Sequence, residues 1–366
     1  SKSAAPPTRT RFGLPPLVVS GEAEPTLDDA GVVLEQTHPT LQKQGVTVCS
    51  FDRATREHAA LLTEHFGSLL HDDYDWYTAL GASVRQGGLF VHVPKGVRAE
   101  IPVRMFHWID GAGRLVAPRT VVIVEDDAEV TVIEEMLSET VEGTSLHAGG
   151  VEVFVGANAK LTYAQLQDWG RNVFHYGNVR ARVARDAELQ WMQIMVGGRM
   201  TKANGYYDLN GTGARAFVNG FMFGDARQHF HLHTLQRHLQ PNCTSDLLIK
   251  CCLKDKARSV YQGLIQVAEG ASKPIFQRRH VTSCGSRFAM KRRRSHLVHP
   301  RLNLDSAGSA SAVSTERQSR NGRRVSTAKC IEFLSSKRSR AGRFARSMSS
   351  RCTCPRSRIA SASARR

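Results

Sequence analysis

A mainly β fold, built as a β-helix of stacked short strands, is predicted by three features of this 366-residue sequence. From Leu89 to about Ala271 apolar residues recur with the period of two that is typical of strands. One turn pattern recurs between the strand runs, and its small residues Ala128, Ala159 and Ala187 lie 31 and 28 residues apart. Such a repeat indicates a solenoid or a propeller, but a propeller blade needs roughly 40 residues and four strands, whereas each unit here supplies about two. A two-sheet sandwich is the alternative that strand counting leaves open.

The chain before the β region is predicted to divide into an arm and a helical region. Residues 1–45 are rich in Pro, and we expect an extended arm with one short helix near Asp28–Gln42. Residues 46–88 form the predicted helical region, with Asp52 as the N-cap of its first helix. The apolar residues of that helix follow at i, i+4 and i+7: Leu62, Phe66 and Leu69. A second helix is expected over Asp75–Val84, with one apolar face: Trp76, Leu80 and Val84.

The β-helix is predicted to span residues 89–272, where short runs rich in β-branched residues alternate with turn formers. The predicted strands are Leu89–Val93, Thr120–Val124, Val151–Val155, Val179–Val183, Ala216–Phe223, Leu247–Leu253 and Val260–Val267. Small residues suit the coil corners because successive coils lie only ~4.8 Å apart. We expect Val155, Val183 and Val267 to point inward at these corners.

The net charge of +17 is distributed very unevenly along the chain. Residues 273–366 carry 20 Arg and 4 Lys against three acidic residues, a net charge of +21, while residues 1–272 carry −4. The C-terminal part has no apolar periodicity and an excess of Arg and Ser, so an irregular basic tail is predicted there. A tail of this charge binds nucleic acid, without sequence preference.

Several classes of protein are not expected. No run of ~18 apolar residues is present, so no membrane span is predicted, and no leader opens the chain, so we do not expect secretion. Eight Cys are too few for a disulfide scaffold and form no C-x-x-C pair, which indicates a cytoplasmic protein with reduced thiols. A phosphate-binding G-x-x-x-x-G-K-[ST] loop and a G-x-S-x-G nucleophile elbow are both absent from the sequence.

The densest group of candidate metal ligands is an alternating histidine run, His229, His231 and His233. On a strand these three imidazoles share one face, with Phe230 and Leu232 on the other. Imidazole and thiolate suit iron, so the run is a candidate for transient metal or cluster handling, and an ordinary polar strand face is the alternative. Cys252 is expected on an outer face with Lys250, as the more reactive thiol, while Cys251 faces the core.

Four segments together resemble the SufB/SufD family of scaffold proteins of the Suf iron–sulfur cluster assembly system, with the closer match to the SufD branch. The matching segments are Leu89–Val97, Leu161–Gly170 (similar to the family's LQNWG stretch), Thr244–Lys250 and Ala257–Ile265. The resemblance implies a right-handed parallel β-helix and a non-enzymatic scaffold that pairs with SufB-like and SufC-like subunits, or with a second copy of itself. It also implies no stably bound cofactor, and a transient Fe–S cluster in the complex.

The resemblance ends after Lys273, in the middle of a family strand. The family's Cys-x-His-Gly segment and its SufC-docking helices have no counterpart in residues 273–366. An out-of-frame translation of a GC-rich gene explains this composition better than a genuine nucleic-acid arm, which is the alternative. A β-helix polysaccharide lyase or hydrolase is the enzymatic alternative, but it needs paired carboxylates at the scissile bond, and Glu125, Asp126 and Asp127 fall at a turn.

Overall fold

The computed structural model describes residues 38–85, 87–109, 111–285 and 309–316, all within one compact unit, Leu17–Val325. Most of the predicted arm and most of the predicted tail therefore lie outside the described residues. The same holds for the first part of the helix predicted at Asp28–Gln42, whose last residues overlap a helix that begins at Pro39. Among the described residues no helix is both long and apolar enough to cross a membrane.

The N-terminal helical region is more broken than predicted. Its elements are α1 (Pro39–Lys43), β1 (Thr47–Ser50), α2 (Phe51–Glu57), α3 (Ala59–His65) and α4 (Trp76–Ser83). The N-cap of α2 is Ser50 and not Asp52, because the hydroxyl of Ser50 accepts from the Arg53 N–H at 3.3 Å. The non-helical backbone of His58 separates α2 from α3, and Phe66 already caps the end of α3.

Helix α4 confirms the second predicted helix, but it buries a different face. Asp75 caps it by accepting from the Thr78 N–H at 2.8 Å. Thr78 and Gly81 are the residues that it buries, whereas Trp76 is 65% exposed. A Cβ at Gly81 would lie 2.9 Å from the carbonyl oxygen of Ala148, so the missing side chain lets the helix approach a strand closely.

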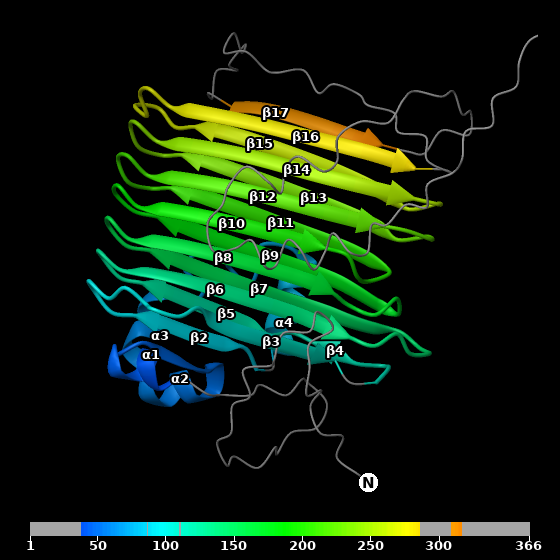
Figure 1. Cartoon of the computed structure of the whole chain (residues 1–366), viewed down its shortest axis with the longest axis horizontal. Helices are drawn as coiled ribbons and strands as arrows, with labels where there is room; N and C mark the ends of the chain where they lie inside the picture. Colours follow the sequence, from blue (N-terminus) through cyan, green and yellow to red (C-terminus); the bar gives the residue numbers. More distant parts are fainter. Residues whose placement is uncertain (1–37, 86, 110, 286–308, 317–366) are drawn as a thin grey trace, which may run out of the picture. The chain divides into compact units, whose positions relative to one another are not determined.

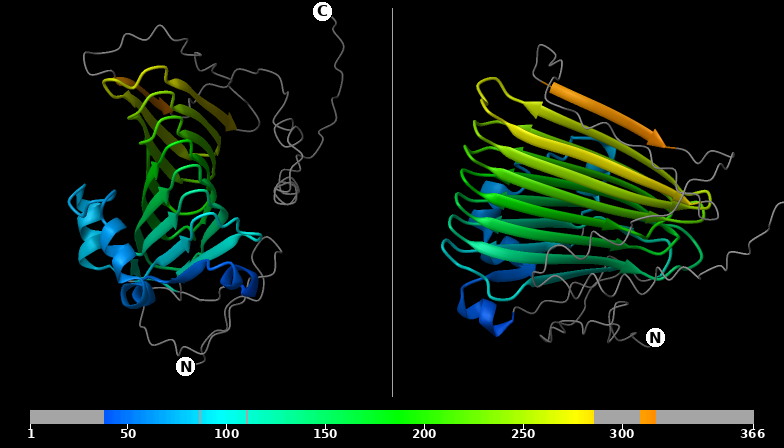
Figure 2. Two further views of the ribbon diagram at one scale, coloured as in Figure 1. Left: turned by 90° about the vertical axis from the view of Figure 1, so that its left-hand side faces the viewer. Right: turned by 45° about the horizontal axis from the view of Figure 1, so that its top comes forward.

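Two facing sheets, parallel except at β1 and β17, form a β-solenoid (Figures 1 and 2). Sheet A contains β1, β2 (Leu89–Val93), β4 (Leu115–Val116), β5 (Arg119–Val124), β7 (Ser145–Val155), β9 (Val173–Val183), β11 (Met200–Leu209), β13 (His229–His238), β15 (Arg258–Val267) and β17 (Ser309–Glu316). Sheet B contains β3 (Val103–Ile109), β6 (Glu129–Ser138), β8 (Lys160–Asp168), β10 (Glu188–Met195), β12 (Arg215–Gly224), β14 (Thr244–Lys254) and β16 (Ile275–Gly285). From β5 to β16 the chain passes from one sheet to the other at each successive strand, so the solenoid is confirmed and the sandwich alternative is wrong.

The coil corners between sheet A and sheet B repeat one local conformation. In each, a residue with positive φ precedes an inward small or branched residue, and these positions recur every 27 to 31 residues: Gly96, Asp127, Asn158, Asp186, Gly213, Asn242 and Gly270. Gly, Asn and Asp tolerate this left-handed conformation best. The N–H of Asp127 donates to the carbonyl of Ala157 in the next corner, and that of Asn158 to Arg185, so the corners are bonded to one another.

Apolar side chains fill the solenoid next to these corners. Trp191 stacks on Tyr163 with ring centroids 4.3 Å apart, and both are buried. Val155 and Val183 point inward as predicted. Val267 is only half-buried, because the pairing of β15 with β17 stops at the residue before it.

Strands β16 and β17 correct the prediction that everything after residue 273 is irregular. β16 pairs in parallel with β14, and β17 pairs antiparallel with β15. Without these two strands, the edges of β14 and β15 would leave backbone N–H and C=O groups unpaired, and such edges readily accept another strand. The sheets therefore continue for at least one strand each beyond the predicted boundary.

Candidate functional site

The predicted histidine run lies on β13, and its alternation is confirmed. His229, His231 and His233 are half-buried on the outer face of sheet A, whereas Phe230 and Leu232 are each 1% exposed and face the core. The strand period of two therefore determined the side-chain directions, as the sequence predicted.

These histidines do not form a metal site with one another. His231 Nε2 lies 2.9 Å from Gln262 Oε1, and His233 Nδ1 lies 3.1 Å from the Tyr206 hydroxyl, so the rings are held by different neighbours. Burial, followed by the charge of His231, lowers the pKa of both His229 and His233. Within the described part of the chain, no three His, Cys, Asp or Glu side chains are placed to hold a metal ion.

The predicted reactive thiol lies on the other sheet. Cys252 belongs to β14 of sheet B and is half-buried, next to the buried Cys251. The outer faces of sheets A and B point away from each other, so Cys252 and the histidines of β13 are not brought together. The core position of Cys251 is as predicted.

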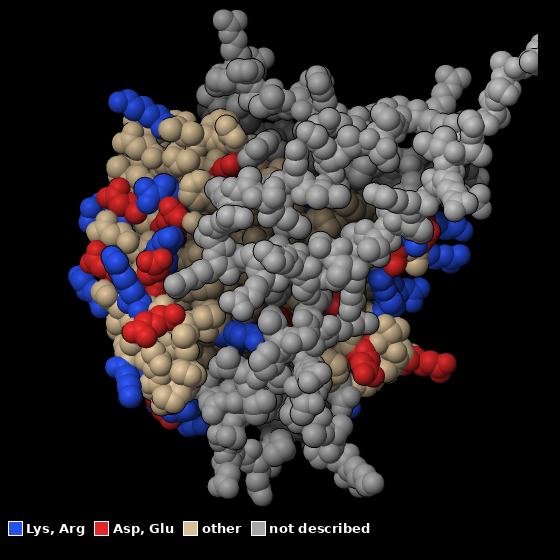
Figure 3. Space-filling view, viewed as in Figure 1, with Lys and Arg blue, Asp and Glu red and all other residues tan. Residues whose placement is uncertain are grey.

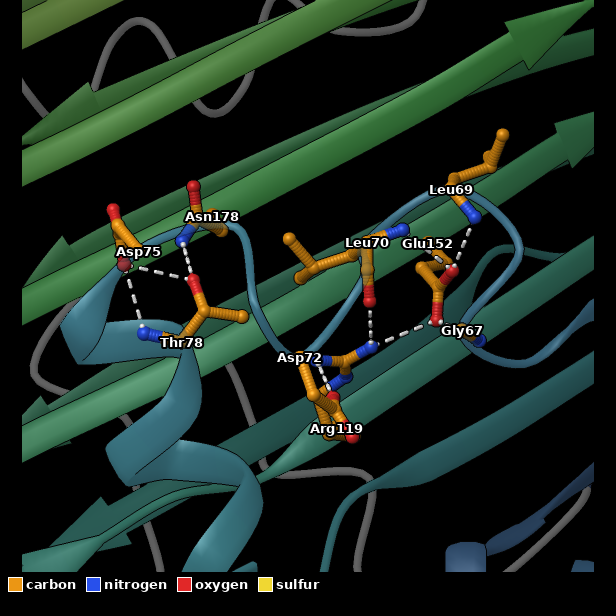
Figure 4. A network of polar contacts seen from close by, with 9 residues as sticks. All are labelled: Gly67, Leu69, Leu70, Asp72, Asp75, Thr78, Arg119, Glu152 and Asn178. Carbon is orange, nitrogen blue, oxygen red and sulfur yellow. Dashed lines mark hydrogen bonds and ion pairs between the residues drawn. The ribbon is translucent and has the colours of Figure 1, made fainter.

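A covering segment, residues 67–83, lies across the outer face of sheet A and ends in α4 (Figure 4). Its anchor is Glu152 on β7, which is fully buried. Glu152 accepts the backbone N–H groups of Gly67 at 2.9 Å and of Leu69 and Leu70 at 3.0 Å. Arg119 on β5 neutralises the carboxylate at 3.0 Å and donates to the Leu70 carbonyl at 2.9 Å.

The same segment carries polar side chains that bond to β9 and β11. The hydroxyl of Thr78 accepts from Asn178 at 3.2 Å, and Asp75 accepts from the hydroxyl of Tyr176. Burial alone would raise the pKa of Asp75, but the hydrogen bonds from Tyr176 and Thr78 lower it below its ordinary value. Asp75 is therefore a carboxylate in the folded protein at neutral pH.

An open pocket of 320 Å³ lies where the covering segment meets strands β11, β13 and β15. Tyr74 and Asp75 contribute from the segment, and the other lining side chains come from the strands: Lys202, Asn204, Tyr206, His231, His233 and Gln262. Two of the three predicted histidines thus line a pocket together with groups far away in the sequence.

A column of polar side chains occupies part of the solenoid interior. Glu134, Gln165 and Gln193 take equivalent register positions on β6, β8 and β10. Gln165 donates to Glu134 at 2.7 Å, and Gln193 donates to Gln165 at 3.2 Å. Tyr163 also donates to Glu134, at 2.8 Å. All four side chains are buried, so this column places a hydrogen-bonded carboxylate inside the fold.

Three imidazoles line a small cavity together with this carboxylate. His107 Nε2 lies 2.9 Å from Glu134 Oε1, and the Nδ1 atoms of His147 and His175 lie 2.9 Å apart. Trp169 donates to Nδ1 of His175 at 3.1 Å, so that atom is an acceptor and His175 carries its proton on Nε2. The adjoining cavity has an accessible volume of 10 Å³, which is room for about one water molecule.

Burial determines the charges of this interior. It lowers the pKa of His147, and it lowers the pKa of His175 to about 4, so both are neutral at pH 7. Burial alone would raise the pKa of Glu134, but the contacts with His107, Gln165 and Tyr163 lower it. This interior offers no preformed metal site among the described residues.

Two models of known protein families match this chain. The SufBD core domain of SUF system FeS cluster assembly matches residues 107–275, and the SufBD protein N-terminal region matches residues 29–105. The chain belongs to the SufB/SufD family. The core-domain match runs from within β3 to the first residue of β16.

Relatives in the SufB/SufD family are distant and longer. The iron–sulfur cluster assembly protein SufB of Bacillus subtilis (strain 168) is 27% identical over 250 residues, which cover 68% of this chain and 54% of that protein. A SufBD family protein of Staphylococcus epidermidis (strain ATCC 12228) is 26% identical over 243 residues, covering 66% and 52%. The chain spans about half the length of these curated relatives.

The acidic turn at Glu125, Asp126 and Asp127 gives the enzymatic alternative no support. Glu125 accepts from the Lys95 N–H at 2.9 Å and lies 2.8 Å from His92 Nε2, and Asp126 accepts from the Ala157 N–H at 2.7 Å. These carboxylates hold the corners of a SufB/SufD-type solenoid.

The surface charge of the described residues is mixed on the face drawn in Figure 3. Acidic and basic side chains are interspersed along the edge of these residues, so that edge has no uniformly positive potential that would attract a polyanion.

The interior polar residues were not identified from the sequence, although a signal for them exists. His147-Ala-Gly149 and His175-Tyr-Gly177 repeat a His-x-Gly pattern 28 residues apart, which is one coil. A Cβ at Gly149 or Gly177 would lie 2.4 or 2.8 Å from the adjacent imidazole, so each glycine makes room for its histidine. The repeated pair therefore indicates inward-facing imidazoles once the coil length is known.

Proposed function

We propose that this chain is a SufD-type scaffold subunit of Suf iron–sulfur cluster assembly and catalyses no reaction of its own. The observation that carries the proposal is the agreement between family match and fold. The SufBD core region, residues 107–275, covers the stacked strands from within β3 to β15, and the SufBD N-terminal region precedes it and includes the covering segment.

The thiol content supports a SufD-type role rather than that of a principal cluster carrier. Four free cysteines have described side chains: Cys49, Cys243 and Cys251 are buried, and Cys252 is half-buried. Burial raises the pKa of Cys243 and keeps it protonated, and a protonated thiol is a poor metal ligand. Such a subunit would share a transient cluster with a thiol-bearing partner and would hold no cofactor stably.

The proposed partners are a SufB-like subunit and a SufC-like ATPase, in the cytoplasm. The sequence has no phosphate-binding loop, so ATP hydrolysis must come from the SufC-like subunit. Pairing of two copies of this chain is the alternative assembly. The SufB-like contact would rely on the solenoid, whereas the SufC-like contact would need the family's C-terminal helices.

Co-expression of the tagged full chain with SufB-like and SufC-like subunits of its own organism tests the proposal. Native mass spectrometry should detect a complex with the SufB-like subunit, and ATP hydrolysis should require the SufC-like subunit. A SufC-like subunit lacking its phosphate-loop lysine is the control and should abolish turnover. Failure to bind the SufB-like subunit, or ATP hydrolysis by this chain alone, would contradict the proposal.

A further inference from the structure

A buried positive charge lies against the tyrosine rings at the outer pocket of sheet A. Arg180 on β9 is 6% exposed, and its guanidinium lies 3.7 Å from the ring centroid of Tyr206 and 4.3 Å from that of Tyr74. It donates to the carbonyl of Val179 at 3.1 Å, while its second terminal nitrogen, Nη2, has no hydrogen-bond partner in the described part of the chain. A buried cation that lacks a full set of hydrogen bonds is costly, and an anion bound nearby would offset part of that cost.

A second cation stands in the pocket itself. Lys202 on β11 is half-buried and lines the pocket, with Nζ 5.5 Å from the ring centroid of Tyr176. Among the residues lining the pocket, Asp75 is the one carboxylate, and its oxygens are already engaged by Tyr176 and Thr78. Asp208 also attracts Arg180, but it is itself paired with Arg237. Lys202 and Arg180 therefore bring two positive charges to the pocket and its floor, against one carboxylate in the lining.

The remaining polar groups favour a ligand with more than one negative charge. His231 and His233 line the same pocket. Burial and then the nearby cations, including Lys202, lower the pKa of His233, so a dianion beside it would favour proton uptake by the imidazole. A carboxylate needs only one cation, whereas phosphate uses several donors and suits a lysine.

Aromatic groups form the wall next to these donors. Tyr74 is 43% exposed, and it packs edge-on against Tyr206 with ring centroids 5.7 Å apart. His233 also packs edge-on against Tyr206, with ring centroids 5.3 Å apart. The 320 Å³ of the pocket are at the lower end of the range for small-molecule sites, about 300–1,000 Å³.

We propose that this pocket binds a small phosphate-bearing molecule, with Lys202 contacting the phosphate and the tyrosines contacting the rest of the ligand. The inference is independent of the role in cluster assembly, since it uses the outer face of sheet A and neither the interior nor a partner subunit. Arg180 contributes from beneath the rings through its charge.

Isothermal titration of the full chain with phenyl phosphate, inorganic phosphate and benzoate tests the proposal. Phenyl phosphate should bind saturably, with a dissociation constant on the order of 0.1–1 mM, and benzoate should bind at least about tenfold more weakly. Tighter binding of phenyl phosphate than of inorganic phosphate would show that the ligand is a ring-bearing ester, and equal binding would show that it is the free anion.

Variants separate the pocket from the arginine-rich C-terminal segment, which attracts anions by itself. Lys202→Gln should weaken phenyl phosphate binding at least about tenfold, the effect of losing one charge-assisted hydrogen bond. The exposed Lys256, in the turn between β14 and β15, offers a matched control: Lys256→Gln should leave the affinity unchanged. Circular dichroism checks that both variants fold. Equal weakening by the two substitutions, no saturable binding up to about 10 mM, or benzoate binding as tight as phenyl phosphate would overturn the proposal.

Discussion

Replacing Glu152 by glutamine should release the covering segment from sheet A. Glu152 accepts from three backbone N–H groups of the segment, and its fourth contact is the ion pair with Arg119. Glutamine has nearly the same shape but only one acceptor oxygen. In either orientation of the amide, an NH₂ group therefore faces donors: Leu69 and Leu70 in one, Gly67 and Arg119 in the other.

The expected cost follows from these contacts. A buried donor left without a partner costs about 1–3 kcal/mol, and breaking a buried ion pair from one side costs about 3–5 kcal/mol. In either orientation two donors are left without an acceptor, and Arg119 loses its countercharge. We therefore expect Glu152→Gln to destabilise the docked segment by about 3–5 kcal/mol. The solenoid keeps its own strand pairing, so the loss should be local.

Hydrogen exchange measured residue by residue is the suitable assay. A loss of 3 kcal/mol corresponds to roughly 100-fold faster exchange, which should appear at the amides of Leu69 and Leu70 and through α4. The central strands β8 and β10 should exchange as in the wild type. The structure also predicts weaker protection of the Gly67 amide, which bonds to the same carboxylate.

Glu142→Gln is the matched control, because Glu142 is exposed and its substitution removes the same charge. It should leave the exchange of the covering segment unchanged. If Glu152→Gln changes exchange at Leu69 and Leu70 by less than about threefold, the anchoring role derived from these contacts is wrong.

Three further predictions concern the solenoid itself. Burial holds the pKa of His238 at about 4, below its ordinary 6.5, so the folded protein binds fewer protons than the unfolded chain between these values and should lose stability as pH falls from about 6.5 to 4. His238→Gln should remove about 2 kcal/mol of that loss at pH 5. Equal pH dependence of the two proteins in urea unfolding would contradict this. Asn158 has φ of 56°, so Asn158→Val should be about 1–2 kcal/mol less stable than Asn158→Gly by chemical denaturation, and equal stabilities would exclude backbone strain as the cause. Leu189→Ala should cost about 2–5 kcal/mol in the buried core, against less than about 1 kcal/mol for Met192→Ala at a 45% exposed site, and similar losses in thermal unfolding would refute the assigned strand faces.

Local chemistry explains which features could be predicted. The coil corners were recognisable because Asp127, Asn158 and Asp186 are residue types that tolerate positive φ and recur at one coil length. The faces of β13 followed from the strand period, which sends His231 outward and Phe230 inward whatever the neighbours are.

Strands with polar interiors were harder to predict. β6, β8 and β10 were not among the predicted strands, because Glu134, Gln165 and Gln193 interrupt their apolar alternation. These residues face inward because they satisfy one another across neighbouring coils, and a single strand contains no trace of that pairing.

Sequence alone thus determined the repeat, the corners and the side-chain directions within a strand, since all of these depend on residues within one coil. Only the tertiary structure decided which side chains from distant parts of the sequence become neighbours. The parallel register brings Glu134 within 2.7 Å of Gln165, 31 residues away, and the covering segment brings Tyr74 onto Tyr206, 132 residues away. Hydrogen bonds of buried polar groups select these arrangements, because a polar side chain removed from water must find its partner wherever the fold places one.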